Sequence, residues 1–139
     1  MKVKLKNVYA IVIAVVTMSA CGGSGDDNAG QTSEFQVSPA EKTINSGTNN
    51  CPTNNAKAGD FLVIGGAAPY TAFSSSALIT FGPAGSTTPT TAGSYEISNR
   101  NTQFAIFVSN CVSPAIVTVL DKLNRVATIS VTAASGSGS

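Results

Sequence analysis

The chain contains no histidine and no tryptophan, and only 11% of its 139 residues are charged. Without histidine, it can form neither a serine–histidine–aspartate triad nor a cysteine–histidine pair for nucleophilic catalysis. A zinc site usually takes four ligands, and the thiols of Cys51 and Cys111 alone are too few. We therefore expect no enzymatic activity, no metal site and no cofactor.

Carboxylates are also scarce, and they lie far apart in the sequence. Those after residue 34 are Glu41, Asp60, Glu96 and Asp121. Each lies beside an expected turn or strand end, where capping or solvation is its ordinary role. A glycosidase needs two carboxylates that converge across a cleft, and this spacing does not predict one. A phosphate-binding loop is not indicated either, since the glycine pair at 65–66 lacks the required spacing and following helix.

Basic residues are too few to form a surface for nucleic acid. The chain has eight lysines and arginines against seven aspartates and glutamates, and Lys2, Lys4 and Lys6 belong to the N-terminal segment. Without residues 1–20, five basic residues face seven acidic ones, a balance of −2. No basic cluster with interleaved aromatic residues occurs, so we expect no nucleic-acid partner.

The longest apolar run lies near the N-terminus, after a basic start, and covers residues 9–20. A membrane-spanning helix needs about 20 residues, so this run is typical of a cleaved signal peptide. It ends in Met18-Ser19-Ala20-Cys21, which resembles the lipobox of bacterial lipoprotein precursors. The resemblance implies cleavage after residue 20 and acylation of Cys21, which gives a stable membrane anchor. An ordinary signal peptide with an incidental cysteine is the alternative.

The segment after Cys21 is predicted to be a tether. Residues 22–33 are rich in glycine and polar residues, without apolar periodicity, and as a flexible coil they would span roughly 20 Å. The Asp26-Asp27 pair fits a solvated linker better than a metal site. Gly22 stands where an aspartate would imply inner-membrane retention, so the lipoprotein resemblance implies the outer membrane.

Residues 34–133 are predicted to form one all-β domain. Threonine, serine, valine, isoleucine and glycine dominate this region, and short β-like runs recur between turn residues. That pattern indicates an antiparallel sandwich of about seven strands. Strands are expected at 35–38, 61–64, 70–74, 78–81, 95–97, 103–108, 116–120 and 126–131. The Ser- and Gly-rich residues 134–139 are expected to be a disordered tail.

Two turns organise this domain. After the apolar run 61–64, Gly65 and Gly66 permit backbone angles that a Cβ would forbid, and Pro69 directs the chain into a strand that begins at Tyr70. In the last hairpin, Asp121 can accept turn amides. Asn124 tolerates left-handed geometry there.

These turns carry a family resemblance. Val63-Ile-Gly-Gly-Ala-Ala-Pro-Tyr-Thr71 resembles the GG-x-x-P-Y motif of bacterial immunoglobulin-like repeats, and residues 116–131 are similar to their closing hairpin. Asn124 stands where that family usually has glycine. The resemblance covers residues 35–132 and implies an immunoglobulin-like sandwich with structural motif residues and no active site.

The two remaining cysteines are predicted to pair. Cys51 and Cys111 form an even pair in a chain with an export signal, and oxidising compartments favour disulfides. Closing a loop of about 60 residues would stabilise the domain by roughly 4 kcal/mol in the chain-entropy model. Two buried thiols and a two-thiol metal site are the alternatives.

Aromatic residues are few, and we expect Tyr70, Phe73 and Phe81 to pack in the core. An exposed aromatic platform for a sugar is the alternative.

Two function classes fit these observations. The first is a non-enzymatic, lipid-anchored envelope module with structural, adhesive, or protein- or glycan-binding roles. The second is a periplasmic ligand-binding or inhibitor lipoprotein that uses the polar loops 45–57 and 82–93, since function often resides in loops on rigid scaffolds. An unpaired edge strand also offers a place for strand addition by a partner.

Overall fold

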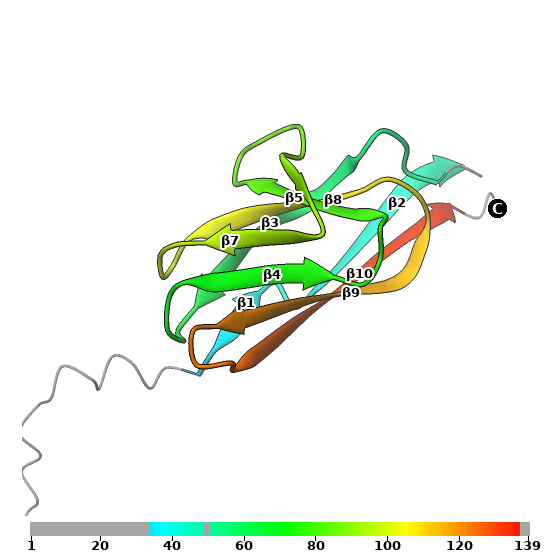
Figure 1. Cartoon of the computed structure of the whole chain (residues 1–139). Coiled ribbons are helices and arrows are strands. Elements are labelled where there is room, and N and C mark those ends of the chain that lie inside the picture. Colours follow the sequence, from blue (N-terminus) through cyan, green and yellow to red (C-terminus); the bar gives the residue numbers. More distant parts are fainter. Residues whose placement is uncertain (1–33, 49–50, 137–139) are drawn as a thin grey trace, which may run out of the picture.

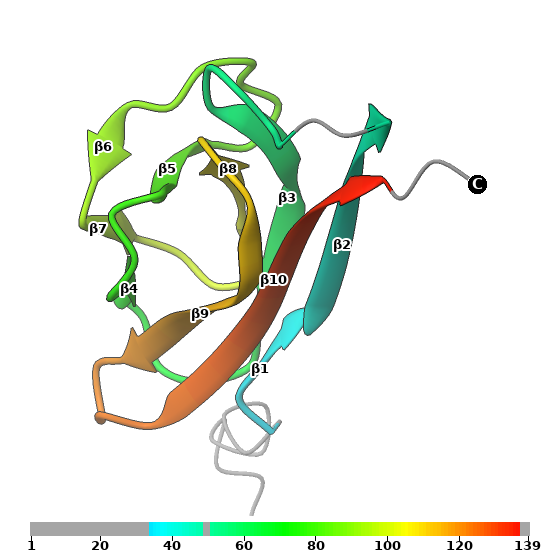
Figure 2. The ribbon, with the colours of Figure 1, turned by 90° about the vertical axis from the view of Figure 1, so that its right-hand side faces the viewer.

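The computed structural model describes residues 34–48 and 51–136, and within them the chain forms ten strands and no helix (Figure 1). The strands make two five-stranded sheets that pack face to face (Figure 2). The all-β sandwich expected from the sequence is therefore confirmed, with more strands than the seven or so anticipated. The predicted signal peptide, Cys21 and the tether 22–33 lie outside the described residues.

The first sheet has the strand order β1-β3-β8-β5-β6, and every neighbouring pair is antiparallel. Its strands are β1 (Gln36–Ser38), β3 (Ala56–Ile64), β8 (Gln103–Val108), β5 (Ile79–Pro83) and β6 (Thr91–Ala92).

The second sheet has the order β2-β10-β9-β4-β7. Its strands are β2 (Glu41–Thr48), β10 (Val126–Gly136), β9 (Val112–Asp121), β4 (Tyr70–Ser74) and β7 (Ser94–Ile97). Unlike the other described pairs, β2 and β10 run parallel, which departs from the antiparallel expectation. Proline has no backbone N–H, so Pro39 ends the pairing of β1 with β3, and the chain crosses to the other sheet beside β10.

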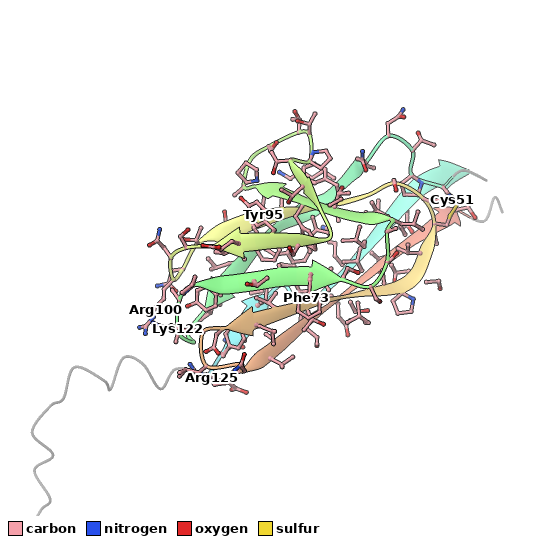
Figure 3. All side chains as sticks on the ribbon, in the orientation of Figure 1. Cys51, Phe73, Tyr95, Arg100, Lys122 and Arg125 are labelled. Atoms are coloured by element: carbon pink, nitrogen blue, oxygen red, sulfur yellow. A yellow bond between two sulfur atoms is a disulfide. The ribbon has the colours of Figure 1, made fainter. Side chains whose placement is uncertain are left out.

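The core fills the space between the sheets and follows the two-residue period of the strands. In β4, Tyr70 and Ala72 are buried while Thr71 and Phe73 face outward. Phe81 is buried as expected, but Phe73 is 36% exposed, so its predicted core position is wrong (Figure 3). Because Tyr70 and Phe73 stand an odd number of positions apart in one strand, only one of them can face the core.

Strand β8 is buried on both faces, and its sequence is apolar from Phe104 to Val108. Phe104, Ile106 and Val108 belong to the main core, and Phe107 is buried on the opposite face. A Cβ placed on Gly82 would lie 3.3 Å from both the Phe107 ring and the Thr88 carbonyl oxygen. The loop that contains Thr88 therefore packs beside Phe107.

Several boundaries differ from the sequence prediction. Strand β2 continues to Thr48 and β3 begins at Ala56, so both ends of the predicted loop 45–57 are strand. Strand β10 runs to Gly136, so the expected disordered tail does not begin at residue 134. The ends of β2 and β10 pair with each other, Ala134 with Asn45 and Gly136 with Thr48. This pairing supplies backbone hydrogen bonds that cannot be predicted from the local sequence.

Candidate functional site

The sequence singled out two turns and one cysteine pair, and the structure places them at opposite ends of the sandwich. Gly65, Pro69 and Asp121 lie at the end where β1 begins, and Cys51 lies at the other end, where β2 ends (Figures 1 and 3).

The glycine turn requires both of its glycines. Gly65 and Gly66 have φ of +67° and +71°, in the left-handed region that side chains disfavour. A Cβ on Gly66 would also lie 2.7 Å from Phe35 Cδ2 and 3.1 Å from Tyr70 Cε1. The absence of a side chain thus lets the turn pack directly against two aromatic rings.

Tyr70 connects this turn to the core. Its ring is fully buried and stacks on Phe35, with ring centroids 5.7 Å apart. Its hydroxyl donates a hydrogen bond of 2.7 Å to the carbonyl oxygen of Gly65. Burial raises the pKa of Tyr70, and the positive charge of Arg100 opposes part of that rise. The exposed Pro69 precedes Tyr70, and the peptide bond between Ala68 and Pro69 is cis.

Asp121 joins the glycine turn to the final hairpin. Its buried carboxylate accepts hydrogen bonds from the amides of Ala67 (3.0 Å), Leu123 (2.9 Å) and Arg125 (2.8 Å). The Arg125 guanidinium adds a hydrogen bond from Nε at 2.8 Å and an ion pair from Nη2 at 2.7 Å. Asn124 has a φ of +59°, so the left-handed turn position predicted for it is confirmed.

The same contacts set the acidity of Asp121. Burial acts to raise its pKa, but hydrogen bonds from Arg125, Ala67 and Leu123 outweigh burial and hold the pKa below its usual value. The carboxylate is therefore charged, and both of its oxygens are engaged. It holds two turns together and has no oxygen left to act as a general base. We call Gly65, Gly66, Tyr70, Asp121 and Arg125 the turn junction.

The sequence predicted only part of the turn junction. Acceptance of hairpin amides by Asp121 was expected from the residue type, and it is confirmed. Its bond to Ala67 spans 54 positions, and no local pattern announces it. The spacing of Asp121 and Arg125 across a short turn was the available signal for their ion pair.

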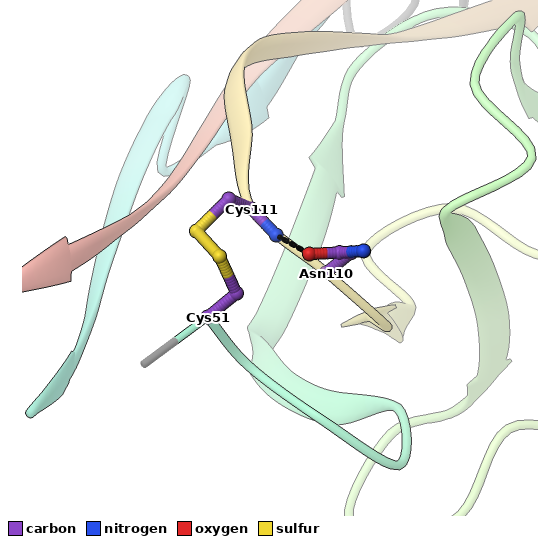
Figure 4. Close-up of a disulfide and its surroundings, with 3 residues drawn as sticks. All are labelled: Cys51, Asn110 and Cys111. Carbon is purple, nitrogen blue, oxygen red and sulfur yellow. Dashed lines mark hydrogen bonds between the residues drawn. A yellow bond between two sulfur atoms is a disulfide. The ribbon is translucent and has the colours of Figure 1, made fainter. Parts of the chain in front are cut away.

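Cys51 and Cys111 form the predicted disulfide at the opposite end (Figure 4). Their Cα atoms are 4.8 Å apart across a sequence separation of 60. Cys51 lies between β2 and β3, and Cys111 lies between β8 and β9. Both connections cross between the sheets, so the bond ties two crossovers together. The Cys111 amide also donates a hydrogen bond of 2.7 Å to Asn110 Oδ1.

Each of the two polar loops is tied to a strand of the first sheet. Asp60 Oδ1 accepts a hydrogen bond of 3.1 Å from the Gly85 amide, and Asp60 Oδ2 pairs with Lys57 Nζ at 2.9 Å. Chiefly through the Lys57 hydrogen bond, these contacts hold the pKa of Asp60 below its usual value. The Thr80 hydroxyl also donates a hydrogen bond of 3.4 Å to Asn55 Oδ1. The role of Asp60 in anchoring a loop was missed, because its partner is distant in sequence.

Within residues 34–48 and 51–136, no group of three or more potential metal-ligating side chains occurs. That part of the chain also has no helix with the length and hydropathy needed to cross a membrane. The chain matches no protein-family model, no curated protein and no solved structure.

Proposed function

We propose that this chain is a non-enzymatic, lipid-anchored protein of the bacterial cell envelope. Its immunoglobulin-like sandwich serves as a structural, adhesive or binding module. The observation that carries the proposal is the Cys51–Cys111 disulfide, in a chain whose start resembles a lipoprotein signal. Disulfides persist in oxidising compartments, and a lipoprotein signal is an address to such a compartment.

The anchor is assigned to Cys21 from the Met18-Ser19-Ala20-Cys21 resemblance, with residues 1–20 removed. Glycine at position 22 supports the outer membrane as the destination. The domain then faces either the periplasm or the cell surface.

The structural contacts of two carboxylates, Asp121 and Asp60, support a role without catalysis. Asp121 holds the turn junction, and Asp60 holds a loop to β3. Both have a lowered pKa, which is the opposite of what a general acid requires. A binding or spacer role needs only a stable scaffold, and the sandwich provides one.

Metabolic labelling with palmitate tests the anchor. The full precursor, expressed in a Gram-negative host, should incorporate label and fractionate with membranes. The Cys21→Ser variant should lose both properties while the Cys51–Cys111 disulfide still forms. An unlabelled wild-type chain in the soluble fraction would refute the proposal.

A second candidate, ligand binding by the polar loops, is favoured by one observation. The loop that contains Asn55 accepts a hydrogen bond from Thr80 of β5, and the loop that contains Gly85 donates one to Asp60 of β3, so the sheet holds both loops in place. Exchange of the exposed Thr87 and Thr88 for alanine should then abolish binding of any ligand found by screening, without changing the melting temperature.

A further inference from the structure

The described chain begins at the same end of the sandwich as the turn junction. Phe35 stacks on Tyr70, and Gln36 pairs with Ile64, next to the glycine turn. The Lys122 amide donates a hydrogen bond of 2.9 Å to the Ala67 carbonyl oxygen, so the β9–β10 turn lies at this end as well. The turn between β7 and β8 also lies here, because Val63 N donates to Thr102 O.

This end exposes an apolar tip with basic flanks. Leu123 is 64% exposed and Val126 is 57% exposed. Lys122 and Arg100 are exposed, and the Arg125 side chain is 41% exposed beyond its pair with Asp121 (Figure 3). We call these five residues the basic tip.

The charge of the basic tip is opposite to that of the rest of the mature sequence. Basic residues after position 33 are Lys42, Lys57, Arg100, Lys122 and Arg125. Of these, the last three lie in the tip, where Arg125 is paired with Asp121, and Lys57 is paired with Asp60. The carboxylates near the tip are the buried, paired Asp121 and the exposed Glu34 and Glu96.

Such a surface fits the headgroup layer of an anionic bilayer. Lysine and arginine side chains near an anionic surface are attracted to it. Long basic side chains keep their charges at the headgroups while their stems lie along apolar surface. Leu123, at the point of the turn, would then enter the boundary between headgroups and acyl chains.

The distance to the anchor favours this contact. Cys21 and Glu34 are separated by residues 22–33, which even fully extended reach at most about 45 Å. As a coil, they would span roughly 20 Å. A tether of this length gives an effective concentration on the order of millimolar, so a weak contact suffices.

We propose that the basic tip rests on the anionic headgroups of the bilayer that holds Cys21, with the disulfide end pointing away. This inference relies on the lipid anchor of the proposed function. It adds an orientation, and it assigns a partner surface to Arg100, Lys122 and Leu123.

The absence of tryptophan makes a direct test possible. The mature lipidated chain carrying Leu123→Trp would be reconstituted into phosphatidylethanolamine vesicles with 25% phosphatidylglycerol, containing lipids brominated near the headgroup. Emission should shift to shorter wavelength, and brominated lipid should quench it at least twofold. The matched control is Thr53→Trp, an exposed site beside Cys51, which should show neither change.

Charge reversal tests the basic flanks. Arg100→Glu with Lys122→Glu, in the Leu123→Trp background, should remove most of the quenching. Lys42→Glu, on the exposed part of β2, should leave it intact. Arg125 is kept because it supports Asp121, and unchanged melting temperatures confirm that each variant folds. Quenching that survives the double reversal would overturn the electrostatic contact.

Mass spectrometry of the same samples separates this inference from the proposed function. If Cys21 carries lipid and Leu123→Trp is unquenched, the basic tip does not contact the bilayer, and the anchor stands. If Cys21 carries no lipid, the proposed anchor is wrong. Sedimentation of the unlipidated chain with phosphatidylglycerol vesicles then tests whether the basic tip binds an anionic bilayer. Binding at low salt that the double reversal abolishes supports the tip, and no binding overturns it. If residue 123 is buried against another protein instead of lipid, the proposed contact between the basic tip and the bilayer is also wrong.

Discussion

The two ends of the sandwich are fastened by different chemistry. At the far end, one covalent bond between Cys51 and Cys111 joins two crossovers. At the end where β1 begins, the turn junction joins the glycine turn to the β9–β10 turn through hydrogen bonds and an ion pair. A disulfide is broken by reductant and is unaffected by mild acid. The turn junction depends on the charged carboxylate of Asp121, which acid protonates. The two ends should therefore fail under different conditions.

Removal of the disulfide should have the largest effect. Cys51→Ser with Cys111→Ser, or reduction of the wild type, should lower the free energy of unfolding by roughly 4 kcal/mol in the chain-entropy model. Thermal melts of residues 34–139 with and without reductant measure this loss. An unchanged melt, together with two free thiols by mass, would show that the far end does not depend on the bond.

Loss of the Tyr70 ring should rank second. Tyr70→Ala removes a fully buried side chain, and the expected cost is about 3 kcal/mol. Tyr70→Phe keeps the ring but strips the Gly65 carbonyl of its partner, at about 1 kcal/mol. Phe73→Ala, on the outer face of β4, is the matched control and should cost least. Equal costs at Tyr70 and Phe73 would contradict this assignment of faces.

Asp121→Asn should destabilise less than Tyr70→Ala, because the amide keeps one acceptor oxygen. Loss of the charge weakens the bonds from Ala67, Leu123 and Arg125, and the expected cost is about 2 kcal/mol. Chemical denaturation at pH 7 measures it. In the disulfide-free background the cost should be nearly additive, since the two sites lie at opposite ends. A variant as stable as the wild type would mean that the carboxylate charge is not needed.

Acid should produce the smallest effect. Because the pKa of Asp121 is lowered in the folded state, its stabilisation is present above the unfolded value of about 3.9 and is lost as pH falls through the folded-state pKa. Asp60 behaves in the same direction. Melts near pH 6 and pH 3 should show the gap between wild type and Asp121→Asn closing in acid. A constant gap would argue against a charged Asp121 in the fold.

Much of the sandwich could be predicted from local pattern. Alternating residues marked β9 and β10, and the mostly apolar run 103–108 marked β8. Most of the missed features depend on distant partners. The ends of β2 and β10 are polar segments that become strands because they pair with each other. Phe73 was placed in the core by composition, although its odd spacing from Tyr70 already pointed it outward.

The two ends also differ in how predictable they were. The disulfide could be predicted because, with Cys21 assigned to the expected lipid anchor, the two remaining cysteines have one possible pairing. The turn junction could be predicted only in its local parts, such as Asn124 and the amides that Asp121 accepts. Its long-range bond to Ala67 follows from the pairing of β4 with β9, in which Tyr70 lies opposite Asp121, and no local window of sequence contains that pairing.

The central claim is a lipid-anchored module fastened covalently at its far end, and the intact mass of the membrane-extracted protein tests it most directly. The account predicts a chain that begins at an acylated Cys21 and weighs about 2 Da less than the fully reduced form, because one disulfide is present. A mass that matches the uncleaved precursor, or a chain without lipid, would contradict the anchor. A mass that reduction leaves unchanged would contradict the covalent fastening of the far end.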